Sequence, residues 1–334
     1  MSLIDDWRNI PSPGFSRERE GRVTVAVLPH SLRPMLDGRL PDWLEPRWWD
    51  TPENLVEMAA QAEIGWFDLH EKPAALAAVA RARGLRWLNS SYAGIDWLPL
   101  DDLARRGVTL TGGTGLTASQ VAEFAVLGML AIAKDYPAVV RAQDRGEWLA
   151  APPAIRDLAG RRALIIGHGA IGQAIGRALR GFDVETVAVR RRAGEGALDP
   201  GQWRARLGDF DWIVLAVPGT PDTKAMIGAA ELAAMKTEAV LVNFARADCV
   251  DQPALIAALH EGGIAAARLD QTDPEPRPPS HELWRIPNAH VTMHLSGIPT
   301  PASQARAAER FLRNCVRFHA GEPLEAAADL TRGY

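Results

Sequence analysis

The chain has 334 residues, 47% of them hydrophobic and 23% charged, which is typical of a globular enzyme with two domains. Its formal net charge of −4 gives no general attraction to nucleic acid or anionic membranes, so we expect neither as a partner. Cys249 and Cys315 make no disulfide framework, and the N-terminal sequence MSLIDDWRNIPSPGF lacks the apolar region of a secretory signal. We therefore expect a cytoplasmic protein.

Strand and helix patterns alternate in the first third of the chain. The predicted strands span 23–28, 64–67 and 85–89, and the predicted helices begin at Glu53 and span 74–83. The aromatic, proline-containing stretch 43–49 is interpreted as a loop and partner surface. This alternation predicts a parallel sheet covered by helices.

A second series of strands and helices begins after Gly107. Its predicted strands span 108–110, 163–166, 184–189, 213–217, 240–243, 265–269 and 290–293. Its predicted helices run from Ser119 through Val140, over 170–179 and 253–260, and from Thr300 to His319. The apolar run 121–133 is too short to span a bilayer and is expected to be a buried helix on a partner surface. The sequence thus predicts two doubly wound α/β units.

A glycine-rich turn lies between a predicted strand and a predicted helix. It consists of Gly167, His168, Gly169, Ala170, Ile171 and Gly172. Gly167 permits the tight turn, Gly169 lets a pyrophosphate approach the backbone, and Gly172 lets helix and strand pack closely. The pyrophosphate is expected at the helix N-terminus, whose N–H groups and dipole favour an anion. The pattern therefore predicts dinucleotide binding, although such a turn also occurs in other α/β proteins.

The strand after this turn ends at Arg190, Arg191 and Arg192. NAD-specific sites usually carry an acidic residue here, which binds the ribose hydroxyls and repels a 2′-phosphate. Three guanidinium groups suit that phosphate instead, so we expect NADP(H) to be preferred, with NAD(H) possible. A solvated basic loop is the alternative interpretation of the three arginines.

Chemically active side chains follow the ends of three later strands. They are Arg246, Asp270 with the nearby Glu275, and His294. Ligands of open α/β sheets bind at the carboxyl ends of strands, so these side chains are candidates for one site. Reduction of a 2-keto acid needs a cation for the carboxylate and a proton donor for the carbonyl oxygen. Arg246 suits the first role, and His294 with Glu275 on its second ring nitrogen suits the other.

These motifs, in order and spacing, resemble the D-isomer-specific 2-hydroxyacid dehydrogenase family, which includes glyoxylate/hydroxypyruvate reductases. The resemblance runs from about Leu85 to Tyr334. The matching segments are SSYAGIDWLPL, VAE, GHGAIG, VPGTPDTKAMIG, NFARADCVDQPALIAAL, LDQTDPEP, LWRIPN, MHLSG and GEPLEAAADLTRGY. It implies a dehydrogenase in which Arg246 binds substrate and Glu275 pairs with the catalytic His294. The expected reaction interconverts a small 2-keto acid and its D-2-hydroxy acid.

The resemblance also implies further contacts and a domain plan. The backbone of Tyr92, Ala93 and Gly94 is expected to bind the substrate carboxylate, and Asp270 to lie near the nicotinamide amide. The expected cofactor contacts also include His294 and the residues Val217, Pro218, Thr223, Phe244 and Ala245. A Rossmann cofactor domain over 108–296 is expected to be inserted in a flavodoxin-like substrate domain formed by 1–107 and 297–334. The helix from about Thr117 is expected to form a homodimer interface.

Some residues depart from the family pattern. Ala247 stands where the family usually has Gly and would be strained if that position requires a positive φ. Gln271, Thr272 and Met293 also replace the usual residues and are expected to tune the pocket. We expect no metal, because His290 and His294 on a strand would lie about 13 Å apart at roughly 3.3 Å per residue. The alternatives are a non-catalytic dinucleotide sensor or corepressor on the same fold, and a relative acting on an anion such as phosphite.

Overall fold

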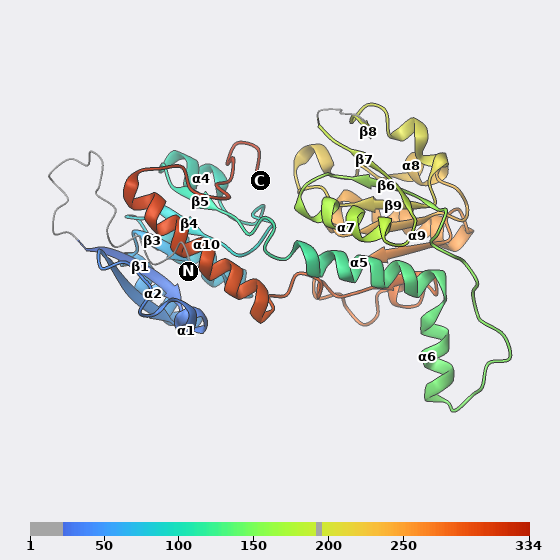
Figure 1. Ribbon diagram of the computed structural model, residues 1–334, viewed down its shortest axis with the longest axis horizontal. Helices are drawn as coiled ribbons and strands as arrows, with labels where there is room; N and C mark the ends of the chain where they lie inside the picture. Colours follow the sequence, from blue (N-terminus) through green and yellow to red (C-terminus); the bar gives the residue numbers. More distant parts are fainter. Residues whose placement is uncertain (1–22, 192–195) are drawn as a thin grey trace. The chain divides into compact units, whose positions relative to one another are not determined.

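The computed structural model describes residues 23–191 and 196–334, which form two compact units (Figure 1). The smaller unit comprises the described residues up to Leu116 together with Pro299–Tyr334, and the larger unit comprises Thr117–Ile298. The N-terminal segment, in which we expect no secretory signal, and Arg192 of the arginine cluster lie outside the described residues. Within the described residues, no helix is both long and apolar enough to cross a membrane.

The smaller unit contains a five-stranded parallel sheet. Its strands are β1 (Thr24–Pro29), β2 (Leu44–Trp49), β3 (Ile64–Trp66), β4 (Trp87–Asn89) and β5 (Thr109–Thr111). Their order in the sheet is β2-β1-β3-β4-β5. Its helices are α1 (Arg33–Leu36), α2 (Pro52–Met58), α3 (Lys72–Arg81), α4 (Leu100–Arg105) and α10 (Pro301–Ala320). This strand order is the flavodoxin-like one that the sequence predicts.

Both faces of the smaller sheet are buried. Side chains alternate along β1, so that Leu28 packs in one cluster with Phe311 of α10, and Val27 packs in another with Leu55 of α2. Trp66 and Trp87 lie on the α10 face, with ring centroids 5.2 Å and 4.9 Å from that of Phe311. Aromatic packing of this kind adds to the free energy gained by burial and fixes the C-terminal helix on the N-terminal strands.

The stretch 43–49 is a strand, so its interpretation as a loop is wrong. Strand β2 pairs in parallel with β1 along its whole length and lies at the edge of the sheet. Pro46 is compatible with an edge strand because its missing N–H need not take part in the ladder. Trp49 is buried and its Nε1 donates to the carbonyl oxygen of Trp66 at 2.9 Å, which ties β2 to the core.

The larger unit contains a seven-stranded parallel sheet. Its strands are β6 (Arg162–Ile166), β7 (Glu185–Val189), β8 (Ala197–Leu198), β9 (Trp212–Leu215), β10 (Val240–Asn243), β11 (Ala266–Leu269) and β12 (Ala289–Val291). Their order is β12-β11-β10-β9-β6-β7-β8. The sequence order therefore runs outward in opposite directions from the neighbouring strands β6 and β9, as in a Rossmann fold. Its helices are α5 (Ala118–Ala133), α6 (Tyr136–Asp144), α7 (Ala170–Arg180), α8 (Ala229–Ala234) and α9 (Gln252–Glu261).

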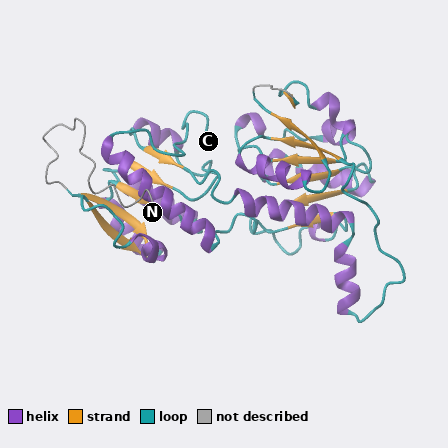
Figure 2. Ribbon diagram, in the orientation of Figure 1, coloured by secondary structure: helices purple, strands orange, loops and turns teal. Residues whose placement is uncertain are grey.

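Helices cover both faces of this sheet as well (Figure 2). Leu164 and Ile166 of β6 pack in one cluster with residues of α8 and α9, whereas Ala163 and Ile165 pack with α5 and α7. Strands buried on both faces are continuously apolar, which is why the sequence marks them clearly. The predicted fold class, two doubly wound parallel sheets, is confirmed.

The single helix predicted from Ser119 through Val140 is two helices. Helix α5 ends at Ala133, and Asp135 has a φ of +41°, which breaks the helical path before α6 begins at Tyr136. Pro137 falls in the first turn of α6, where its missing N–H costs no hydrogen bond. In Figure 1, α6 extends away from the sheet of its own unit.

The chain passes between the units at Leu116–Thr117 and at Ile298–Pro299. The first passage lies beyond the expected boundary at 107–108, because β5 pairs with β4 and so belongs to the sheet of the smaller unit. The sequence of so short a strand does not show which sheet it joins. Only its hydrogen-bonded neighbour in the structure shows this.

Candidate active site

The glycine-rich turn joins β6 to α7. Gly167 has a φ of +106°, and a Cβ on it would lie 2.4 Å from the carbonyl oxygen of Ala216. A Cβ on Gly172 would lie 2.0 Å from the carbonyl oxygen of Gly167, so only glycine permits this contact of helix with turn. Gly169 is the N-cap of α7, and a Cβ on it would have no neighbouring atom within 4 Å. No side chain caps the first turn, where Ala170 and Ile171 begin the helix, so this turn fits a pyrophosphate.

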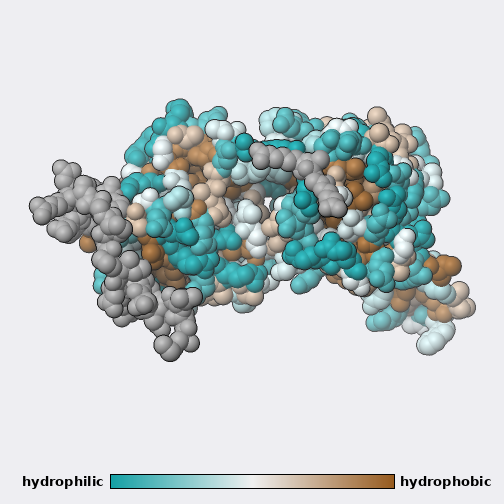
Figure 3. Space-filling model, turned by 45° about the horizontal axis from the view of Figure 1, so that its top comes forward, coloured by the Kyte–Doolittle hydropathy of each residue, from teal (hydrophilic) through white to brown (hydrophobic). Residues whose placement is uncertain are grey.

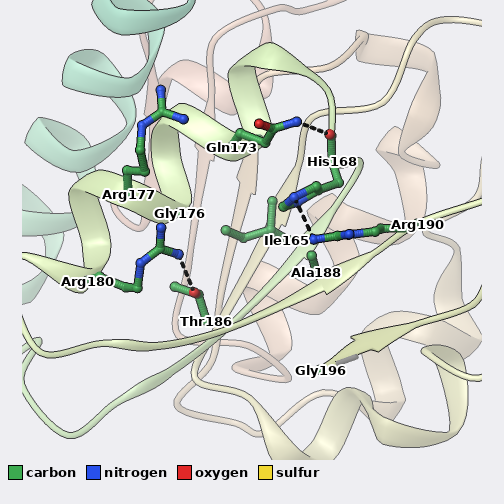
Figure 4. Close-up of a pocket in the computed structure, with 11 residues that line it drawn as sticks. Ile165, His168, Gln173, Gly176, Arg177, Arg180, Thr186, Ala188, Arg190 and Gly196 are labelled. Atoms are coloured by element: carbon green, nitrogen blue, oxygen red, sulfur yellow. Dashed lines mark hydrogen bonds between the residues drawn. The ribbon is translucent and has the colours of Figure 1, made fainter. Parts of the chain in front are cut away.

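Arg190 follows the last residue of β7, at the position where an acidic residue would mark NAD specificity. Its Nη2 lies 3.0 Å from Nε2 of His168, in the glycine-rich turn (Figure 4). Burial lowers the pKa of His168, and the charges of Arg190 and Arg180 lower it further. A neutral His168 therefore accepts a hydrogen bond from the Arg190 guanidinium. Arg191 lies in the bend that follows.

The other expected cofactor residues follow two neighbouring strands. Val217 and Pro218 follow β9, and Oγ1 of Thr223 donates to the carbonyl oxygen of Pro218 at 2.8 Å. Phe244 and Ala245 are buried directly after β10. Since β9 pairs with both β6 and β10, these loops and the glycine-rich turn leave the same edge of the sheet.

His294 and Glu275 form a hydrogen-bonded pair. Nδ1 of His294 lies 2.9 Å from Oε2 of Glu275, and the other carboxylate oxygen accepts from the backbone N–H of Thr272 at 2.8 Å. The backbone N–H of His294 donates to the carbonyl oxygen of Asp270 at 2.7 Å. Met293 and His294 have φ values of +55° and +57°, an uncommon conformation that is frequent at functional sites. The pairing leaves Nε2 of His294 to exchange a proton.

Asp270 is buried at the end of β11 and holds the segment that carries His294. Oγ1 of Thr292 donates to one carboxylate oxygen at 2.8 Å, and Oγ of Ser296 donates to the other. These bonds fix the chain on both sides of His294. The structure thus gives Asp270 a positioning contact that the sequence does not predict.

Arg246 follows β10 in extended conformation, with a φ of −134°. Its Nη1 donates to the carbonyl oxygen of Ala245 at 2.9 Å and to Oε1 of Gln271 at 3.4 Å. Gln271 is adjacent to Asp270, so Arg246 reaches the loop that also carries Glu275. Ala247 begins a short 3₁₀ turn and is absent from the residues with positive φ, so the strain considered for this position does not arise.

Asn243, the last residue of β10, was not a predicted site residue. Its side chain is buried, its Nδ2 donates to the carbonyl oxygen of Arg246 at 2.8 Å, and its Oδ1 accepts from the N–H of Ala245 at 2.9 Å. The amide thereby closes the loop that presents Arg246. A polar residue ending an otherwise apolar strand is the signal that could have identified it.

Tyr92, Ala93 and Gly94 lie in the smaller unit, in the loop after β4. Asp68 holds the start of this loop, because its carboxylate accepts from Oγ of Ser90 at 2.7 Å and from the backbone N–H of Ser91. Loss of water around the Asp68 carboxylate raises its pKa, against the opposing effect of these bonds. Burial, with the nearby Asp68 charge, raises the pKa of Tyr92 to about 12. Asp68 is a second residue that the sequence analysis missed.

Comparison with known proteins supports the family resemblance noted in the sequence. The family model described as D-isomer specific 2-hydroxyacid dehydrogenase, NAD binding domain, matches residues 126–296. A glyoxylate reductase from Thermococcus gammatolerans is 34% identical over 250 residues, 71% of this chain and 74% of that protein.

Solved structures of related proteins match nearly the whole chain. A D-isomer specific 2-hydroxyacid dehydrogenase family protein from Aeromonas salmonicida has a TM-score of 0.82 and 28% identity, over 92% of this chain and 99% of that one. A D-isomer specific 2-hydroxyacid dehydrogenase from Xanthobacter autotrophicus Py2, in complex with NADPH and MES, has a TM-score of 0.73 and 27% identity, over 93% and 100%. The chain therefore belongs to the D-isomer specific 2-hydroxyacid dehydrogenase family of NAD(P)-dependent enzymes.

Proposed function

We propose that this enzyme prefers NADPH and reduces a small 2-keto acid, such as glyoxylate or hydroxypyruvate, to the D-2-hydroxy acid. The observation that carries this proposal is the His294–Glu275 pair, 2.9 Å apart. The two residues lie on the loops that follow β12 and β11, and β11 lies beside β10, the strand that precedes Arg246. The relative from Thermococcus gammatolerans, named a glyoxylate reductase, supports the substrate class.

Each residue of the pair has a chemical task in this reaction. The dinucleotide, when bound, supplies the hydride that adds to C2 of the keto acid. Nε2 of His294 donates a proton to the carbonyl oxygen, so that C=O becomes CH–OH. Glu275 accepts from Nδ1–H, which fixes the orientation of the ring and leaves Nε2 for the proton transfer. In the reverse direction, the same nitrogen takes the proton from the hydroxyl group.

The substrate carboxylate is held by cationic and backbone donors in this proposal. Arg246 pairs with it through its guanidinium, and the backbone N–H groups of the Tyr92–Gly94 loop donate to it. The cofactor binds along the glycine-rich turn and the loops after β9 and β10, with the amide of its nicotinamide near Asp270. Residues 117–298 then serve as the cofactor domain, and the smaller unit as the substrate domain.

The NADPH preference is supported by Arg190. No acid stands at the end of β7 to repel a 2′-phosphate, and a guanidinium takes its place. The relative from Xanthobacter autotrophicus Py2 was solved with NADPH. NADH remains a weaker alternative substrate in this proposal.

A homodimer through the α5–α6 surface is part of the proposal. Large apolar side chains are exposed at Leu127 of α5, Tyr136 of α6 and Trp148 of the loop after α6, with exposed fractions of 58%, 56% and 96%. Figure 3 shows hydrophobic residues gathered on the projecting α6 region at the lower right. Monomeric proteins rarely expose such clusters. Light scattering should give twice the mass of one chain, and a monomer at micromolar concentration would exclude the dimer.

The free, buried cysteines accord with a cytoplasmic enzyme.

The proposed activity is tested by initial rates of NADPH and NADH oxidation with glyoxylate, hydroxypyruvate, pyruvate and phenylpyruvate. We expect turnover with NADPH on glyoxylate or hydroxypyruvate, and a lower kcat/KM with NADH. Tight dinucleotide binding without turnover on any of these acids would instead support a sensor on the same fold.

A further inference from the structure

Arg277 is a buried cation in the loop that carries Glu275. It is 8% exposed, whereas the neighbouring residues 273–276 and 278–280 are exposed. Arginine is rarely buried unless its charge interacts with another group, so a side chain that turns inward from an exposed loop needs an explanation. The segment LDQTDPEP, which carries part of the family resemblance, ends at Pro276, so the resemblance assigns no role to Arg277.

One nitrogen of the Arg277 guanidinium fastens this loop. Nη2 donates to the carbonyl oxygen of Asp273 at 2.9 Å and to Oε1 of Gln252, the first residue of α9, at 2.7 Å. The first bond closes the segment 273–277 on itself, and the second attaches the segment to the helix. Glu275 is the middle residue of this segment, so both bonds restrict where its carboxylate can lie.

The charge of Arg277 is offset by carboxylates of its own loop. The other two nitrogens, Nε and Nη1, are buried and have no hydrogen-bond partner among the described residues. Burial lowers the pKa of Arg277, and the carboxylates of Asp273 and Glu275 oppose this effect. The guanidinium thus lies where its charge is favourable only because these two carboxylates are near.

Two further ionisable groups lie next to Gln252. Nε2 of His281 is 3.4 Å from Nε2 of Gln252, and Asp251 is the preceding residue. As the N-cap of α9, Asp251 accepts from the N–H of Ala254 at 3.1 Å. Neither group is among the charges that act on Arg277, so its electrostatic partners are those of the loop.

The attraction between Arg277 and Glu275 acts on both partners. Glu275 favours the charged guanidinium, and the guanidinium equally favours the charged carboxylate. This charge matters because the two oxygens of Glu275 accept from Nδ1–H of His294 and from the N–H of Thr272, and a protonated carboxyl loses part of that capacity. The Glu275 side chain is 37% exposed, so solvent screens the attraction and its effect should be modest.

We propose that Arg277 is a positioning residue for the reaction, because its bonds hold the loop of Glu275 in place and its charge keeps the Glu275 carboxylate ionised. This inference rests on the proposed function, in which Glu275 fixes the ring of His294. It adds a residue that touches neither substrate nor cofactor in that function. Arg285 provides a matched control, because it is an exposed arginine of the same connection between β11 and β12.

The test measures the ionisation of Glu275 directly. Full-length protein labelled with ¹³C at the carboxyl carbon of glutamate is titrated by NMR, and the Glu275 signal is assigned by its loss in Glu275→Gln. Arg277→Met and Arg277→Gln both remove the charge, and Met also removes the unpaired N–H groups, which favours a folded variant. In both variants the titration midpoint of Glu275 should rise by about 0.3 pH units or more, because a cation that disfavours its protonation is lost. Arg285→Gln should move the midpoint by less than about 0.1 unit.

Gln252→Met separates the charge of Arg277 from its bonds. This variant removes the acceptor on α9 but keeps the charge, so kcat should fall while the midpoint of Glu275 stays close to that of the wild type. In Arg277→Met, which loses both, kcat with a keto acid should fall by about threefold or more at nearly unchanged KM, because Arg277 binds no substrate. An unshifted midpoint in both Arg277→Met and Arg277→Gln overturns the inference. A shift in Gln252→Met as large as that in Arg277→Met overturns it too, because a loosened loop would then explain both.

The two proposals fail in different ways, because the titration needs neither cofactor nor turnover. A shifted midpoint in a protein that reduces none of the four keto acids would overturn the proposed reaction and support Arg277 as the residue that keeps Glu275 charged. Turnover on glyoxylate or hydroxypyruvate, with an unshifted midpoint in the Arg277 variants, would leave the proposed function standing and overturn only the role of Arg277.

Discussion

Two loops that carry proposed substrate contacts are each held by a polar side chain beneath them. In the larger unit, the amide of Asn243 bonds the backbone of Ala245 and Arg246. In the smaller unit, the carboxylate of Asp68 accepts from Ser90, from the N–H of Ser91 and, at 2.9 Å, from Nε1 of Trp66. An amide both donates and accepts at any pH, whereas a carboxylate gains a donor and loses part of its acceptor capacity when it takes up a proton. The two loops therefore differ in how they respond to pH.

The loops also differ in what they offer a ligand. The larger unit presents side chains. Gln271 contacts the guanidinium of Arg246, and Glu275 contacts the imidazole of His294. The loop at Tyr92 offers backbone N–H groups in the proposed function. A reaction that depends on one side chain can be stopped by one substitution, whereas binding through backbone groups resists such changes. This contrast can be tested directly.

The largest effect is expected from His294→Asn. Asn adopts positive φ readily, so the variant should keep the backbone at +57° while losing the proton donor. Since general acid catalysis contributes roughly 10²- to 10⁴-fold, kcat should fall by that factor at unchanged dinucleotide affinity. Steady-state rates and calorimetric titration measure the two quantities.

The matched substitution in the smaller unit is Tyr92→Phe, which leaves the backbone groups in place. It should change kcat and KM by less than about threefold, as expected for the loss of at most one weak hydrogen bond of the hydroxyl group. If His294→Asn retained wild-type turnover, the assignment of His294 as acid would be wrong. A large loss in Tyr92→Phe would show that this loop acts through a side chain.

An effect smaller than that of His294→Asn is expected from Asn243→Asp, which keeps the shape of the side chain. The carboxylate can still accept from Ala245, but it loses the bond donated to Arg246 and faces that carbonyl oxygen instead. Leaving a buried group unpaired costs about 1–3 kcal/mol of unfolding free energy. We also expect KM for the keto acid to rise, because the loop with Arg246 loosens. Wild-type urea unfolding and KM in this variant would contradict the role given to Asn243.

The sequence predicted those parts of the fold that depend on local pattern. Strands such as β6 and β10 are apolar on both faces, and Gly167 and Gly172 stand where a Cβ would clash with the backbone. It also identified the His294–Glu275 pair, because the resemblance to the family supplied their roles. Strand β2 was missed because Pro46 argues against a strand, except at a sheet edge, and the edge is set by distant pairing.

The residues missed at the site share a different cause. Asn243 bonds backbone groups, and Asp68 bonds one backbone N–H together with the side chains of Ser90 and Trp66. No sequence pattern records which groups the fold brings next to a given polar side chain. The break at Asp135 has a positive φ without a glycine, and Pro137, in the first turn of α6, is the sequence signal that could have marked it. For Asn243 and Asp68 the decisive contacts depend on how the chain packs in three dimensions.

The smallest effect, and the one that separates the two loops most clearly, is the pH dependence of Asp68→Asn. Burial raises the pKa of Asp68, so the folded protein binds its proton more tightly than the unfolded chain does. This group therefore stabilises the fold fully below its unfolded pKa, and that stabilisation is lost as the pH rises through the raised, folded pKa. The unfolding free energy of Asp68→Asn minus that of the wild type should accordingly increase with pH across this interval and then level off. Urea unfolding at a series of pH values from about 3 upward measures the difference.

Asn243→Ala is the control, because an amide does not titrate and its difference from the wild type should stay constant. A constant difference for Asp68→Asn as well would mean that the carboxylate titrates alike in the folded and unfolded chain, and that the two loops are held in the same way.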